Sequence, residues 1–94
     1  DASHDNCKVN GKKDPIAQSL VVHTVMQSLR EHPELRNVVK GFMIESFIKS
    51  GAQKVEQCTP ETIDMSGLSI TDPCIGWEET EKTLRELSES LAHL

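Results

Sequence analysis

Residues 67–79 read Gly-Leu-Ser-Ile-Thr-Asp-Pro-Cys-Ile-Gly-Trp-Glu-Glu and join a polar loop to an amphipathic run. Ser69, Thr71 and Asp72 are short polar residues that favour helix starts, and Pro73 suits a first helical turn. The pattern predicts a helix over about 74–93 with a carboxylate fixed at its entrance. Asp72 is there either a plain N-cap, which is the commoner role, or a ligand. The rest of the chain bears on that choice.

The expected helix over about 74–93 is amphipathic. Apolar or small residues recur at alternating spacings of three and four, opposite a face of Glu, Lys and Arg. This stripe requires an apolar neighbour, either the rest of a domain or a partner helix. Its members are Trp77, Thr80, Leu84, Leu87, Leu91 and Leu94.

A second helix is predicted over about 15–31. Asp14-Pro15 gives a cap and a first-turn proline, and Pro33 ends the helix because proline disfavours helical geometry in the preceding residue. One side carries an apolar stripe at helical spacing, and His23 lies outside it as a solvated residue. The stripe is formed by Val21, Val22, Val25, Met26 and Leu29.

Residues 38–45 form a nearly continuous apolar run that predicts a buried parallel strand. The run ends in Glu45, and a carboxylate at such a strand end is costly unless it is paired or metal-bound. Alternatively, Glu45 has left the sheet and reached water. Residues 49–67 form a polar loop with no assignable element, and loops of this length are uncommon unless functional.

Composition limits the classes of partner. The 94 residues allow one small domain, and a net charge of −5 with scattered Lys and Arg argues against nucleic acid or a membrane surface. No apolar run approaches the roughly 18 residues of a membrane span. The three cysteines are widely spaced and odd in number, which indicates a reducing compartment, and we expect a cytoplasmic protein.

Two helices and one strand do not close a sheet, so the chain is expected to be an α/β segment of something larger, most simply through truncation. His4, Glu45 and Asp72 each stand at a possible strand end or helix entrance. In a (β/α)₈ barrel such positions share one rim, where a His and two carboxylates suit a divalent first-row metal.

The sequence resembles the type I 3-deoxy-D-arabino-heptulosonate 7-phosphate (DAHP) synthases along essentially its whole length. Three motifs carry the resemblance: Asp1-x-Ser3-His4-x-Asn6, Gly41-x-Met43-Ile44-Glu45-Ser46 and, most specifically, Ser69-Ile70-Thr71-Asp72-x-Cys74-Ile75-Gly76-Trp77-Glu78-x-Thr80. The family is a (β/α)₈ TIM barrel. The resemblance therefore implies that residues 1–94 are the C-terminal β/α units of such a barrel, incomplete as a separate chain.

The resemblance also implies a site and a reaction. His4, Glu45 and Asp72 match three of the four ligands of a catalytic divalent metal, which would be Mn, Fe, Co or Zn. The fourth ligand, a cysteine, and the phosphate-binding residues match no position of this chain. The complete enzyme would condense phosphoenolpyruvate with erythrose 4-phosphate and form a homo-oligomer. Metal affinity should fall below about pH 6.5, because the histidine must be neutral to bind.

The chain departs from the family pattern at three positions. Cys7 replaces a serine, Phe47 a histidine and Ala52 an asparagine, which removes polar groups that could orient ligands. As a separate molecule the segment is expected to fold weakly and to be inactive.

Two alternatives remain open. The chain could be a small helical protein-interaction module that docks through its leucine stripe. It could also carry a minor zinc site built from His4, Cys7 and another cysteine, although a lone H-x-x-C lacks the paired spacing of structural zinc sites.

Overall fold

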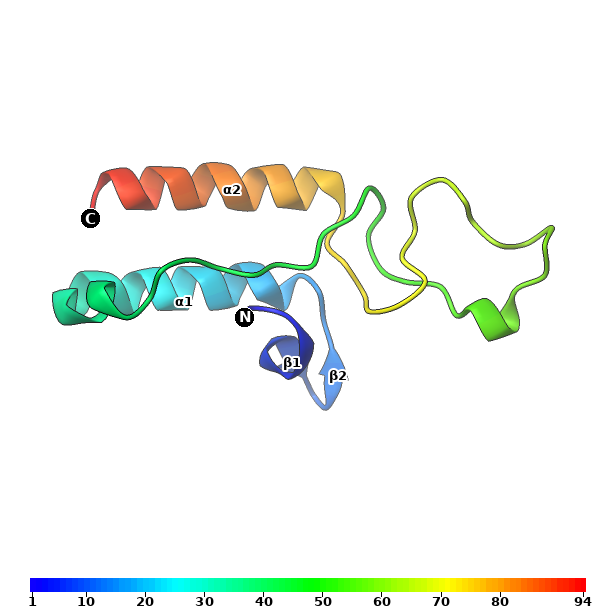
Figure 1. Ribbon diagram of the computed structural model, residues 1–94, viewed down its shortest axis with the longest axis horizontal. Coiled ribbons are helices and arrows are strands. Elements are labelled where there is room, and N and C mark those ends of the chain that lie inside the picture. The colour runs from blue at the N-terminus through cyan, green and yellow to red at the C-terminus, as the bar shows by residue number, and fades with distance from the viewer.

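The computed structural model describes residues 1–94 and is dominated by two helices that lie side by side (Figure 1). In chain order the regular elements are β1 (Lys8–Val9), β2 (Lys12–Lys13), α1 (Ala17–Glu31) and α2 (Trp77–Ala92). Short 3₁₀ helices occupy His4–Cys7, Pro33–Asn37 and Val55–Gln57. Neither long helix is long and apolar enough to cross a bilayer.

Helix α1 supplies most of the small core. Val22, Met26 and Leu29 are buried with Ala2, which comes from the N-terminal segment. Their spacing of three and four residues places them on one side of the helix. His23 is not merely solvated, because its Nε2 lies 2.7 Å from Glu86 Oε2 on α2. This ion pair spans the surface seam between the two helices.

Helix α2 meets α1 through a polar contact and through part of its leucine stripe, because Leu87 and Leu94 pack against the core of α1. Thr83 is the buried residue of α2, and its hydroxyl lies 2.7 Å from the Ser19 hydroxyl of α1. Leu84 and Leu91 are about half exposed. Together with Leu87 they line a hollow of about 240 Å³, opposite residues of α1 and of the 38–44 segment. The predicted stripe is thus only partly covered.

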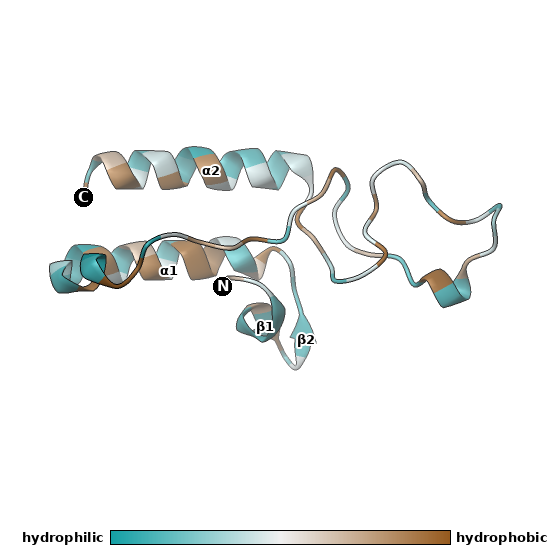
Figure 2. Ribbon diagram, viewed as in Figure 1, coloured by the Kyte–Doolittle hydropathy of each residue, from teal (hydrophilic) through white to brown (hydrophobic).

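The strand expected over about 38–45 is not present as a regular strand. Residues 39–45 have no assigned element and run along the helices (Figure 1). The segment carries apolar residues (Figure 2), of which Val39, Phe42 and Ile44 pack against the core. Its backbone bonds to other segments only near its end, where Met43 O accepts from Ala2 N at 2.9 Å. A β-ladder requires a neighbouring strand along its length, and none lies beside this segment. Immediately after the segment, Ser46 forms an isolated parallel bridge with Ile75.

A short hairpin lies before α1. β1 and β2 pair antiparallel, with Lys8 opposite Lys13 and Val9 opposite Lys12. Asn10 and Gly11 connect them with φ values of 52° and 81°. Two consecutive positive φ values are the mark of a type I′ turn, for which Asn-Gly is the preferred sequence.

The long loop that precedes α2 projects from one end of the helix pair (Figure 1). The radius of gyration is 15.5 Å, whereas a compact domain of this length would have about 12 Å. Only 11 of 94 residues are buried. The hydrophobic core therefore lies between α1 and residues 39–44, and the loop contributes little to it.

Candidate metal centre

The structure brings His4, Glu45 and Asp72 together. His4 Nε2 lies 3.2 Å from Glu45 Oε1 and 3.6 Å from Asp72 Oδ2. One donor atom from each residue lies within 4.8 Å of the others. The three come from the N-terminal 3₁₀ helix, the end of the 39–45 segment and the loop before α2. Residues up to 68 positions apart in sequence thus present one nitrogen and two carboxylates to a common point.

His4 is held by its own N-terminal segment. Its Nδ1 lies 2.9 Å from Asp1 Oδ2 and 2.9 Å from the Ser3 hydroxyl. A carboxylate only accepts hydrogen bonds, so the imidazole donates Nδ1–H to Asp1. In a neutral imidazole with this tautomer, Nε2 would carry the lone pair that binds a cation. The His4 backbone is left-handed, with φ of 55°, which costs roughly 1–2 kcal/mol for a non-glycine residue. Such local strain is common where a side chain is held for function.

Three hydrogen bonds fix the backbone of Glu45. Its N–H donates to Gln18 Oε1 at 2.8 Å, and its carbonyl accepts from Gln18 Nε2 at 3.0 Å and from Ile75 N at 3.1 Å. The Glu45 side chain is 26% exposed, and its Oε1 lies 3.2 Å from His4 Nε2. Glu45 has therefore not left the fold for water, which was the alternative considered from the sequence.

Asp72 does not cap α2. The helix begins at Trp77 with Gly76 as its N-cap, three residues later than expected, so the Asp72 carboxylate is free for other partners. Its Oδ1 accepts from Lys13 Nζ at 2.7 Å. This hydrogen bond holds the pKa of the Asp72 carboxyl below its usual range and raises the pKa of the Lys13 ammonium, while partial desolvation opposes both shifts.

The loop around Asp72 is braced from within. The Ser69 hydroxyl donates to the Asp72 carbonyl at 2.7 Å, and Ser69 is 5% exposed. The Cys74 thiol donates to the same carbonyl at 3.5 Å. Burial raises the pKa of Cys74, so this thiol stays protonated near neutral pH.

Cys7 does not join the cluster that holds His4. Its thiol is buried and donates to the His4 carbonyl at 3.2 Å, away from the imidazole nitrogens. Cys58 lies in the distant loop, where its thiol donates to the Lys54 carbonyl at 3.2 Å. The structure therefore does not assemble the zinc site that the H-x-x-C spacing suggested.

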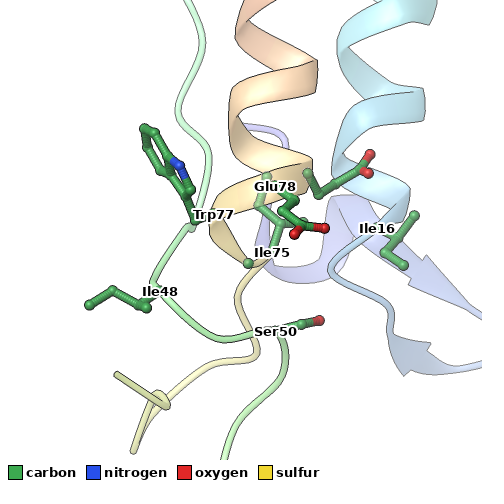
Figure 3. Close-up of a pocket in the computed structure, with 8 residues that line it drawn as sticks. Ile16, Ile48, Ser50, Ile75, Trp77 and Glu78 are labelled. Atoms are coloured by element: carbon green, nitrogen blue, oxygen red, sulfur yellow. The ribbon is translucent and has the colours of Figure 1, made fainter. Parts of the chain in front are cut away.

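The largest hollow lies beside the start of α2 and not at the His4 cluster (Figure 3). It has a volume of about 460 Å³ and is open to solvent on one side. Figure 3 shows Ile48 and Trp77 on one side of it and Ile16 on the other. Ile75 is shared with the cluster through its hydrogen bond to Glu45. The hollow contains no basic side chain, so we assign no anionic ligand to it.

Sequence reasoning missed three residues around the site. Asp1 orients His4, Lys13 bonds Asp72 and Gln18 bonds the Glu45 backbone. Asp1 lies three residues before His4, a spacing that signals a local contact within one turn. Neither Lys13 nor Gln18 has such a signal, because each reaches its partner across the fold.

Comparison with known proteins identifies the family of this chain. The model of the DAHP synthetase I family matches residues 1–85. A relative from Enterobacter agglomerans, the Trp-sensitive phospho-2-dehydro-3-deoxyheptonate aldolase, is 39% identical over 93 residues, covering 99% of this chain and 24% of the relative. The Trp-sensitive relative from Escherichia coli K12 is 35% identical over 91 residues, covering 97% of this chain and 23% of the relative.

A fungal relative gives a similar result. The phospho-2-dehydro-3-deoxyheptonate aldolase AMT16 of Alternaria alternata is 38% identical over 92 residues, covering 98% of this chain and 22% of the relative. The chain thus spans about a quarter of the length of these relatives. Because the family model covers His4, Glu45 and Asp72 together with nearly all of the sequence, this chain belongs to the DAHP synthetase I family.

Proposed function

We propose that His4, Glu45 and Asp72 are three protein ligands of a divalent cation. The observation that carries this proposal is that His4 Nε2 lies 3.2 Å from a carboxylate oxygen of Glu45 and 3.6 Å from one of Asp72. A histidine must be neutral to bind a metal, and with His4 neutral the three atoms are all acceptors, whose mutual repulsion a cation among them would offset. Two ligands each about 2.1 Å from one ion are separated by about 3.0–3.5 Å, which is close to these distances.

The donor set fits a first-row transition metal. One imidazole nitrogen and two carboxylates suit Mn, Fe, Co or Zn, whereas an all-oxygen set would favour Mg or Ca. Asp1 accepts from the second ring nitrogen of His4, as outer partners of metal-bound histidines commonly do. Lys13 donates a hydrogen bond to Asp72 Oδ1, whereas Asp72 Oδ2 faces His4. The side chains of His4 and Asp72 therefore each have one atom held by the protein and another directed into the site, whereas Glu45 is held through its backbone.

We propose that the complete protein is a DAHP synthase, a transferase of the shikimate pathway. It would condense phosphoenolpyruvate with erythrose 4-phosphate and release inorganic phosphate. The bound cation would supply Lewis-acid polarisation of the aldehyde oxygen. The part of this chain in that reaction is to hold three ligands in a fixed geometry. The hydrogen bonds from Asp1, Gln18 and Lys13 limit the movement of those ligands.

We further propose that the chain forms two β/α units at the C-terminal end of a (β/α)₈ barrel. Two units of eight are a quarter of a barrel, which is the share that the chain covers of its relatives. The parallel bridge between Ser46 and Ile75 would then be the remnant of a strand pairing. The unpaired 39–45 segment would gain its neighbours from the rest of the barrel.

The complete protein would be a cytoplasmic homo-oligomer, and the isolated chain would show no turnover because it lacks six of the eight units. The three cysteines are free, as is usual in a reducing compartment. The alternative of an interaction module rests on the half-exposed Leu84 and Leu91. A discrete dimer of the isolated chain that Leu84→Glu abolishes would support that alternative.

A chimaera tests the proposed function. This chain replaces the matching quarter of the Trp-sensitive relative from Escherichia coli, and condensation is followed by phosphate release. We expect turnover that requires a divalent cation and is lost in His4→Ala. Lys82→Met, which changes an exposed residue of α2 far from the cluster, serves as the control and should retain turnover. Cation-independent turnover, or full activity of His4→Ala, would contradict the assignment.

A further inference from the structure

Gln18 is the most deeply buried polar side chain in the molecule, with 0% exposure. It lies in the first turn of α1 and makes both of its amide hydrogen bonds to one residue. Its Oε1 accepts from Glu45 N at 2.8 Å, and its Nε2 donates to Glu45 O at 3.0 Å. A buried amide has to find partners, and here the partners are the main-chain groups of a proposed ligand.

The Gln18 amide occupies the place that a neighbouring strand would have. A strand neighbour offers one carbonyl and one N–H to the residue beside it, and the Gln18 side chain offers the same pair. On the other side, Ile75 N donates to the Glu45 carbonyl at 3.1 Å. Glu45 is therefore fixed between α1 and the segment that follows Asp72, although it lies in no regular strand.

This arrangement restricts the Glu45 carboxylate. With the backbone fixed on both sides, only the side-chain torsions of Glu45 remain free. The same Ile75 lies three residues after Asp72, so one short segment sets the relation between the two carboxylates. Loss of the Gln18 contacts would let the Glu45 backbone shift, and with it the distance to His4.

We propose that Gln18 is a positioning residue for cation binding, which it serves by holding the backbone of Glu45 without touching the cation. This inference rests on the proposed metal site. Outer partners that orient ligands commonly account for a 10- to 100-fold change in metal affinity. The same range is expected for Gln18, because it supplies two of the three hydrogen bonds to the Glu45 backbone.

Titration of the chain with Co²⁺, followed by its visible absorption, provides the test. Gln18→Met keeps the length of the side chain and removes both hydrogen bonds, so the dissociation constant should rise about 10- to 100-fold. Gln18→Glu keeps the acceptor for Glu45 N and should give a smaller rise. Gln27→Met is the matched control, because it makes the same change on α1 but removes a hydrogen bond to Glu31 and none to a ligand. Its dissociation constant should equal that of the wild type.

The outcomes separate the two proposals. A wild-type affinity that His4→Ala leaves unchanged refutes the metal site, and with it the role of Gln18. If His4→Ala abolishes binding but Gln18→Met binds as the wild type does, only the role of Gln18 is overturned. A merely structural role would lower the urea midpoint without changing the dissociation constant of the folded protein. Should Gln18→Met not fold by circular dichroism, wild-type affinity in Gln18→Glu overturns the inference.

Discussion

Asp72→Asn separates two roles of one carboxylate. Its Oδ1 lies 2.7 Å from Lys13 Nζ, and its Oδ2 lies 3.6 Å from His4 Nε2. An asparagine can keep its oxygen toward Lys13, but it then presents an amide donor where the cation would bind. Orienting partners of a metal ligand account for about 10- to 100-fold in affinity, so loss of the ligand itself should exceed about 100-fold.

Lys13→Met is the matched control for this substitution. It breaks the same Lys13–Asp72 contact from the other side but leaves all three proposed ligands in place. Removal of the ammonium makes the site more negative, which favours a cation, but it also frees the Asp72 carboxylate to move, which weakens binding. Because these two effects oppose each other, cation affinity should change by less than about 10-fold in either direction. Both side chains are about one-third exposed, and solvent screening keeps the effect on stability small in each variant.

Co²⁺ titration and urea denaturation, carried out on both variants, give the decisive comparison. We expect similar urea midpoints for Asp72→Asn and Lys13→Met but dissociation constants that differ by more than about tenfold. Equal weakening of cation binding in the two variants would mean that Asp72 acts through its contact with Lys13. Wild-type affinity in Asp72→Asn would remove Asp72 from the ligand set.

Two further predictions concern the stability of the fold. Gly67 has φ of 113°, and a Cβ there would lie 2.6 Å from Ile48 Cβ. Gly67→Ala should therefore lower the free energy of unfolding, measured by urea denaturation, by about 1–3 kcal/mol. Gly41→Ala meets nothing within 4 Å and should be neutral or stabilising by up to about 1 kcal/mol; equal losses would contradict this reasoning. Hydrogen bonds from Lys49 and Ser66 hold the pKa of Asp64 well below its usual range. Its contribution to stability is therefore present above about pH 4 and lost as the pH falls, and Asp64→Asn should flatten the decline in urea midpoint below pH 4.

The two helices could be anticipated because their apolar spacing is local information. Val22, Met26 and Leu29 lie on one side of any α-helix, whatever surrounds it. The predicted first residues of the two helices, about 15 and 74, are too early, because the helices begin at Ala17 and Trp77. An Asp-Pro pair is compatible with a turn as well as with a helix cap. Asp14 bonds the Ile16 N–H through its side chain at 3.1 Å and precedes the first residue of α1.

The segment 38–45 shows that the apolar pattern of a sequence does not determine whether a paired strand forms. An apolar run is the pattern of a strand buried on both faces, and Val39, Phe42 and Ile44 do pack against the core. Regular pairing depends on a second strand, which is a property of the rest of the fold. By contrast, the hairpin has a local signal in the sequence, because Asn10-Gly11 is the residue pair that a type I′ turn prefers.

The proposed ligands were identified from the family motifs, while their surroundings were not. His4, Glu45 and Asp72 belong to motifs that can be read along the chain. Gln18 lies four residues before Val22, so helical spacing places it on the buried face but does not show which group it bonds. Its partner is 27 residues away and is a main-chain group, which leaves no mark on the sequence.

The position of the ligands depends on helix contacts more than on strand pairing. Gln18 fixes Glu45, while the next residue, Ser19, bonds Glu79 and Thr83 of α2. Ile75 N, two residues before α2, reaches the Glu45 carbonyl. The distance between Glu45 and Asp72 is therefore set by the packing of α1 against α2. A change at the helix seam that left every ligand intact would still alter cation affinity, provided that it moved the first turn of α1 relative to that of α2.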